Sequence, residues 1–118
     1  MDAYIIVVSP NGVEGLLHCF PEETLELEEL QGLVGGCIEV VNSMIEPPEG
    51  YDRAVLIVNE EGKLKGLTEN WPATDVADIG GDVIVGNALI MAARGEELVG
   101  LPREVCRKII DDWGLELC

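Results

Sequence analysis

The chain has 118 residues, of which 47% are hydrophobic and 4% aromatic, and its formal net charge is −16 at pH 7. Its length fits one domain over residues 1–118, and its apolar content suffices for an ordinary core, so the acidity does not indicate disorder. The charge excludes the basic surface that binds nucleic acid backbones or anionic lipid, and it favours basic partners.

The charge is unevenly distributed along the sequence. Residues 1–52 hold eleven carboxylates and no Lys or Arg, whereas residues 53–118 hold twelve carboxylates and all seven cations. The start of the chain lacks the basic segment and the long apolar stretch of a secretory signal, and no apolar run approaches the ~18–20 residues of a membrane span. We therefore expect a cytoplasmic protein without membrane contact, whose four scattered cysteines are buried and reduced.

A hairpin and a helix are the first elements that the sequence predicts. Tyr4–Val8 is a β-branched run that ends in a Pro-Asn-Gly turn, and residues 13–19 can return beside it. Thr24 is a candidate N-cap for an amphipathic helix, which Gly35-Gly36 ends, because glycine readily takes the left-handed cap conformation.

A second hairpin is predicted in the middle of the chain. Cys37–Val41 reads as a strand, and residues 44–52 read as a loop. Ala54–Val58 is an apolar run, and the Asn-Glu-Glu-Gly turn at 59–62 leads to residues 63–66. This pattern predicts that residues 63–66 begin a return strand beside Ala54–Val58.

The last part of the chain predicts two helices and two strands. A short helix is expected after Pro72, a strand over Val83–Met91, a short strand at Glu97–Val99 and a helix over Pro102–Trp113 with an apolar stripe. Gly86 indicates a bulge or a close backbone approach. Since strands outnumber helices, we predict an α+β fold: a mainly antiparallel sheet built from hairpins, with two or three helices packed on it.

Four segments in this order resemble DUF3846, a bacterial and phage domain family of unknown function. The segments are Leu30–Val41, Ile57–Leu67, Gly81–Ala88 and Glu97–Leu101. They cover roughly residues 25–105, and the helix–Gly-Gly–strand block combined with the Asn-Glu-Glu-Gly turn is the specific part. The resemblance implies a small cytoplasmic domain that can originate from a mobile element. It implies no activity and no catalytic motif.

The residues themselves indicate no catalytic, cofactor or metal site. His18 is the only histidine, and it is expected on the outer face of the first hairpin. A nucleophilic thiol would require His18 to meet Cys37 or Cys106 together with an orienting group. The cysteines lack the paired spacing of a zinc site. We therefore expect no enzyme activity and no cofactor.

Two features point to a protein contact. Trp71 lies in a predicted loop, where its ring either anchors a partner or caps the core. A run of glutamates before and within the first helix forms either a solubilising face or a docking surface for a basic protein. The candidate contact residues are Glu22, Glu23, Glu26, Glu28, Glu29 and Trp71.

The leading hypothesis is a non-catalytic acidic accessory domain that acts through protein–protein contacts. One alternative is an acidic DNA mimic that inhibits a DNA-binding enzyme, which needs carboxylates aligned like the phosphates of a duplex. Another is a small enzyme or ligand-binding protein with a pocket near Cys37, Trp71 or Asn87. A third is a homo-oligomer that associates through a strand edge or through the apolar stripe at 109–113.

Overall fold

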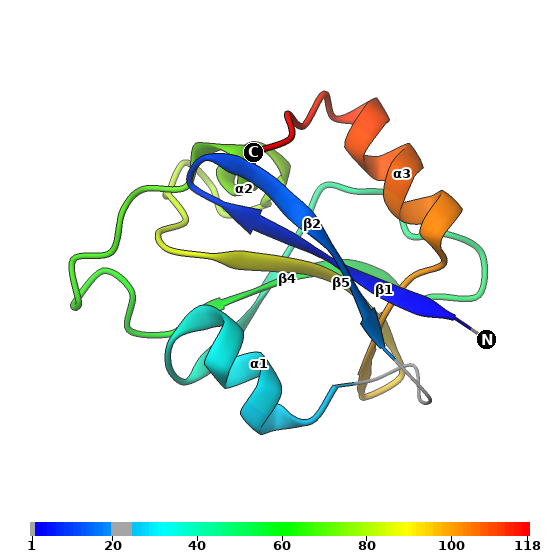
Figure 1. Cartoon of the computed structure of the whole chain (residues 1–118), viewed down its shortest axis with the longest axis horizontal. Helices are drawn as coiled ribbons and strands as arrows, with labels where there is room; N and C mark the ends of the chain where they lie inside the picture. Colours follow the sequence, from blue (N-terminus) through cyan, green and yellow to red (C-terminus); the bar gives the residue numbers. More distant parts are fainter. Residues whose placement is uncertain (1, 20–24) are drawn as a thin grey trace.

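The computed structural model describes residues 2–19 and 25–118, and it is built around one antiparallel sheet (Figure 1). The strands follow the order β2-β1-β5-β4-β3, and β6 pairs with β5. The strands are β1 (Ala3–Ser9), β2 (Gly12–Cys19), β3 (Ile38–Asn42), β4 (Arg53–Asn59), β5 (Ala88–Arg94) and β6 (Glu97–Val99). The helices are α1 (Leu27–Val34), α2 (Trp71–Val76) and α3 (Arg103–Asp112). The predicted α+β fold is confirmed.

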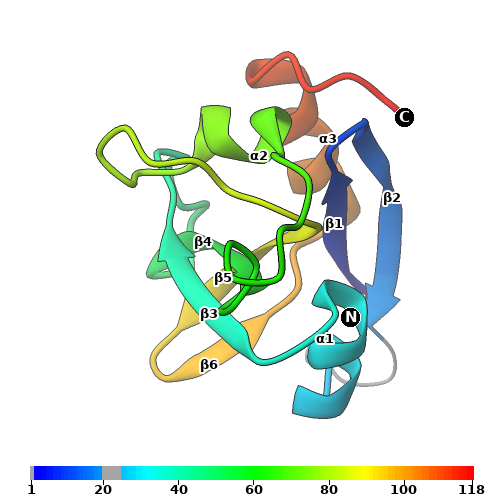
Figure 2. The same ribbon diagram turned by 90° about the vertical axis from the view of Figure 1, so that its left-hand side faces the viewer.

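The sheet is covered on both faces, which explains why nearly every residue of its central strands is buried. Side chains alternate along each strand, so one face of the sheet carries one core cluster and the other face carries a second. Helix α1 packs on one face with Leu30 and Val34, while α2 and α3 cover the opposite face (Figures 1 and 2). In the described part of the chain, no helix is long and apolar enough to cross a membrane.

The first hairpin and the ends of several elements agree with the sequence prediction. β1 and β2 pair from Ala3↔Cys19 to Ser9↔Gly12 around the predicted turn, and β6 has the predicted bounds. Helix α1 ends at Gly35, whose φ of 84° is the left-handed conformation. These signals are local, because turn and cap residues fix the backbone where they stand.

The predicted N-cap of the first helix is wrong. Thr24 lies outside the described residues, and the helix begins at Leu27 with Glu26 as its N-cap. Glu26 and Glu29 form a reciprocal capping box, in which the Glu29 side chain accepts the Glu26 N–H at 3.4 Å.

The predicted second hairpin is also wrong. Residues 63–66 form turns instead of a return strand; the Lys65 N–H donates to the Glu61 C=O at 3.0 Å, and the Leu67 N–H donates to the Gly62 C=O at 3.0 Å. The physical reason is that β4 has no free edge, since β3 pairs with one side and β5 with the other. The Asn59 side chain also accepts the Glu61 N–H at 2.8 Å, which curls the chain away from the sheet.

The predicted strand over Val83–Met91 begins only at Ala88. Residues 85–86, which precede β5, pair with residues 68–69 ahead of α2 instead. There the Gly86 N–H donates to the Thr68 C=O at 2.7 Å. Gly86 has a φ of 74°, and a Cβ there would lie 2.7 Å from Leu67 Cδ1. Of the two roles predicted for this glycine, the structure shows the close approach.

Candidate functional site

The predicted acidic surface is only partly available for docking. Glu22 and Glu23 lie outside the described residues, and Glu26, Glu28 and Glu29 are exposed at the start of α1. Two of these three acids form the capping box that stabilises the helix end. The glutamate run therefore has a structural role that the sequence analysis did not identify.

Trp71 does not cap the core. It is the first residue of α2 and is 55% exposed, so the anchor interpretation fits its position better than the alternative. It lines a pocket of about 380 Å³ together with Trp113, which follows α3. The exposed side chains of Asp75 and Glu116 line the same pocket. Two indole rings and two carboxylates from distant parts of the sequence thus converge.

This combination of groups is suited to a cation. An indole ring attracts a guanidinium or ammonium group to its face, and a carboxylate adds a charge-assisted hydrogen bond. The tyrosines of this chain already have such a cation: the Arg94 guanidinium lies 4.7 Å from the Tyr51 ring, and the Arg103 guanidinium lies 4.7 Å from the Tyr4 ring. Within residues 2–19 and 25–118, neither tryptophan has one.

Of the three residues that the pocket hypothesis offers as alternatives, Trp71 lines a pocket. Neither Cys37 nor Asn87 lines the pocket that contains Trp71. Cys37 lies just before β3, where its C=O accepts the Glu60 N–H at 2.8 Å, and Asn87 is exposed just before β5.

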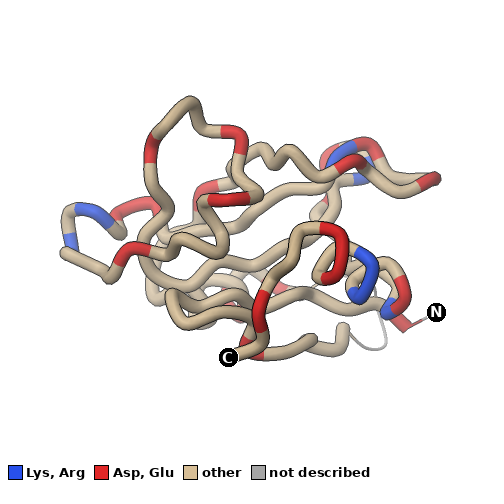
Figure 3. Tube along the Cα trace, turned by 90° about the horizontal axis from the view of Figure 1, so that it is seen from above, with Lys and Arg blue, Asp and Glu red and all other residues tan. Residues whose placement is uncertain are grey.

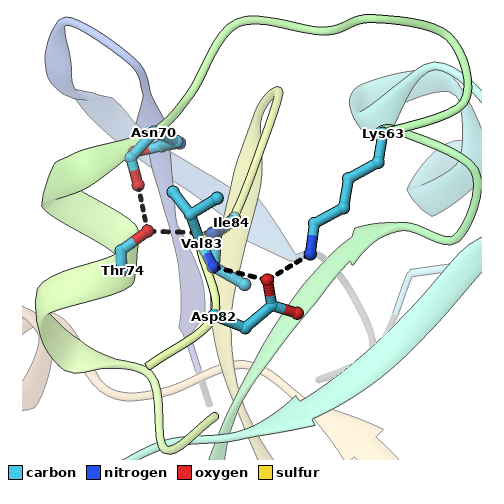
Figure 4. Close-up of polar contacts among 6 residues, drawn as sticks. All are labelled: Lys63, Asn70, Thr74, Asp82, Val83 and Ile84. Atoms are coloured by element: carbon cyan, nitrogen blue, oxygen red, sulfur yellow. Dashed lines mark hydrogen bonds and ion pairs between the residues drawn. The ribbon is translucent and has the colours of Figure 1, made fainter. Parts of the chain in front are cut away.

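A second hollow, of about 200 Å³, lies beside the edge strand β3. Glu39, Val41 and Val58 line it, together with the loops at 60–64 and 79–85. An ion pair between Lys63 and Asp82 joins these two loops, and the Val83 N–H donates to the same carboxylate at 2.8 Å (Figure 4). Two hydrogen bonds lower the pKa of Asp82 below its ordinary value: the one from Lys63 has the larger effect, and the one from the Val83 N–H has the smaller.

The thiols and the histidine form no catalytic arrangement in the described residues. Burial raises the pKa of Cys106 to about 12 and also raises that of Cys19, so both thiols stay protonated at neutral pH. The expectation of four buried cysteines is wrong for Cys37 and Cys118, which are exposed. His18 Nε2 lies 3.2 Å from an Asp2 oxygen, and its ring stacks on Tyr4 with centroids 4.9 Å apart. No group of three or more metal-ligating side chains is found in this part of the chain.

In the part of the chain that the structure describes, Asp and Glu residues are spread over several separate segments of the backbone (Figure 3). Such a distribution lacks the regular spacing of a duplex backbone.

The family model described as domain of unknown function (DUF3846) matches residues 3–114. This match is longer than the region of about 25–105 inferred from the sequence, because it also includes the β1–β2 hairpin and α3. No curated protein and no solved structure shows a significant match to this chain.

Proposed function

Since the chain belongs to the DUF3846 family, whose description names no activity, we propose from its own surface that it is a non-catalytic acidic domain that binds a basic protein. The observation that carries this proposal is the pocket in which Trp71, Trp113, Asp75 and Glu116 converge. A lysine or arginine side chain of a partner is the group that both the indole rings and the carboxylates attract.

The charge of the whole chain supports the same partner class. Seven cations cannot neutralise 23 carboxylates, and the resulting field attracts a basic protein before any contact forms. The field speeds encounter and is screened by salt, whereas the buried part of the contact decides the dissociation rate. A half-exposed tryptophan beside a second aromatic ring is typical of such an anchor.

The arrangement favours a protein partner over mimicry of DNA, because the acids are spread over several elements (Figure 3). We further propose a cytoplasmic setting. The exposed thiols of Cys37 and Cys118 fit a reducing compartment better than an oxidising one.

A pull-down followed by affinity measurement tests the proposal. The tagged chain is used to recover partners at low and moderate salt, and each recovered protein is purified and titrated with the parent chain, Trp71→Ala and Asp75→Asn. Leu27→Ala is the matched control, because Leu27 is 56% exposed and lies on α1, across the sheet from the pocket. We expect a basic partner whose affinity falls with salt and drops about tenfold or more in Trp71→Ala, with no change in the control. A partner that binds all variants equally, or whose affinity does not depend on salt, would contradict the proposal.

A further inference from the structure

In the part of the chain that the structure describes, β3 is an edge strand, and no strand pairs with its outer side (Figure 2). On its inner side it pairs with β4, and the Cys37 C=O accepts the Glu60 N–H at 2.8 Å. The groups that point toward a neighbouring strand alternate along an antiparallel pair. The N–H and C=O groups of Ile38 and Val40 therefore point outward.

Only one end of this outer side is covered by the chain itself. The Asn42 C=O accepts the Asp78 N–H at 2.9 Å, which confirms the alternation, and residues 76–78 pass beside this end of the strand. The chain then turns away through residues 79–82. In the part of the chain that the structure describes, no group binds the outward N–H or C=O of Ile38 or Val40, and Val40 is 44% exposed.

The hollow of about 200 Å³ lies next to this free backbone. Its base is apolar at Val41 and Val58, and the Lys63–Asp82 ion pair joins the loops on its two sides (Figure 4). Side chains of an added strand would alternate between the two faces of the sheet, so every second one would face the hollow. A hollow of this size and lining fits a small aliphatic side chain.

The charges around the hollow select its occupant. Glu39 and Glu60 are exposed there, so basic residues two positions from the aliphatic one, which share its face of the added strand, would be attracted. A second copy of this chain is disfavoured, because it would bring another charge of −16 and its own Glu39 to the same edge.

We propose that the outer side of β3 accepts an extended segment of a partner protein as an added antiparallel or parallel strand, with a small aliphatic residue that faces the hollow and basic residues two positions before and after it. Backbone hydrogen bonds to Ile38 and Val40 provide the affinity, and the hollow and Glu39 provide the selectivity. This site does not rest on the tryptophan pocket, since the two share no lining residue.

The probe is a blocked peptide, acetyl-Thr-Lys-Thr-Val-Thr-Lys-Thr-amide, in which both lysines and the valine share one face, titrated into the ¹⁵N-labelled full chain. The amides of Ile38 and Val40 should shift and become protected from hydrogen exchange. The same peptide with Glu in place of Lys is the charge control and should not bind. Trp71→Ala should bind the lysine peptide as the parent does, which separates this site from the proposed function.

Two variants at the edge make the test specific. Val40→Pro removes an outward N–H without breaking the β3–β4 ladder, and an edge strand tolerates proline at such a position. This variant should bind the lysine peptide more weakly, by about tenfold or more. Val40→Thr keeps the N–H and should bind like the parent. Glu39→Lys changes no backbone group. It should lower the affinity for the lysine peptide and raise the affinity for the glutamate peptide. Equal binding by Val40→Pro and Val40→Thr, shifts confined to β2 or to the tryptophan pocket, or protection that depends on self-association would overturn the proposal.

Discussion

Replacement of Asn70 tests how the fold holds α2 against the sheet. This side chain is fully buried and serves three partners at once. Its amide group donates to the Val8 C=O at 3.0 Å and to the Gly86 C=O at 2.8 Å, and its oxygen accepts the Ala73 N–H at 3.0 Å. One residue thus joins the end of β1, the turn before β5 and the start of the helix that carries Trp71.

The expected loss follows from these three hydrogen bonds. Each contributes about 1 kcal/mol net, and carbonyls left without a donor in the interior add to the loss. The bond to Ala73 is an N-cap bond, whose removal costs about 1 kcal/mol in other helices. Asn70→Ala should therefore lower the free energy of unfolding by about 3–4 kcal/mol, a large part of the ~5–15 kcal/mol typical of a domain.

Urea unfolding measured by circular dichroism tests this value. Asn11→Ala is the control, because Asn11 is exposed in the β1–β2 turn, and its change should stay within about 0.5 kcal/mol. A loss below about 1 kcal/mol in Asn70→Ala would show that the three bonds do not hold α2 in place.

Asn70→Asp makes the free energy of unfolding depend on pH, because the variant loses the two N–H donors of the amide group. The new carboxyl group still caps α2, but it faces two carbonyl oxygens in a buried site, so its pKa in the folded state is raised. A raised folded pKa means that the variant is most stable below the unfolded pKa of about 3.9 and loses stability as pH rises through the folded pKa. A stability difference from Asn70→Ala that does not change with pH would contradict this reasoning.

Three further predictions concern single residues of the described structure. Gly86→Ala should lower the free energy of unfolding by about 1–3 kcal/mol in the same urea assay, because φ is 74° and the new Cβ would lie 2.7 Å from a leucine methyl carbon; an unchanged midpoint would refute this. Cys37 should react at once with a thiol reagent under native conditions, whereas Cys106, buried and with a pKa of about 12, should react only as the chain unfolds; equal rates would refute the burial pattern. Lys63→Met should raise the pKa of Asp82 toward its ordinary value in an NMR titration. Because the parent pKa is lowered, the stabilisation by this pair is complete above the unfolded pKa and is lost as pH falls through the folded pKa; identical titrations of parent and variant would show that the ion pair does not form in solution.

The fold was predictable from the sequence where the signal is local. The Pro-Asn-Gly turn, the glycine after α1 and the apolar stripe of α3 each fix a short backbone segment, and the structure has them where expected. The sequence predicts a strand at residues 63–66 for the same local reason, a turn after an apolar run. They do not form a strand because β3, which precedes β4 in the chain, pairs with one edge of β4, and β5, which is distant in the sequence, pairs with the other; a local pattern contains no information on that competition.

The candidate site shows the same limit. The sequence leaves Trp71 as either a partner anchor or a cap on the core. Its neighbours in the pocket, Trp113 and Glu116, come from the other end of the chain and carry no signal that pairs them with it. The glutamates at 26 and 29 fit a docking face, but their spacing of three residues also matches a capping box. The capping role could therefore be predicted from the sequence alone.

The arrangement of the strands also changes how the uneven charge of the sequence should be interpreted. The acidic first half contributes β1, β2 and β3, while the second half contributes β4 and β5, which lie between β1 and β3 in the sheet. The two halves are therefore interleaved, and the segment without Lys or Arg does not form a separate acidic lobe. The basic partner proposed above would meet a diffuse negative field, which can attract it but cannot orient it. Orientation has to come from shaped features, and the tryptophan pocket and the outer side of β3 are two features with suitable chemistry.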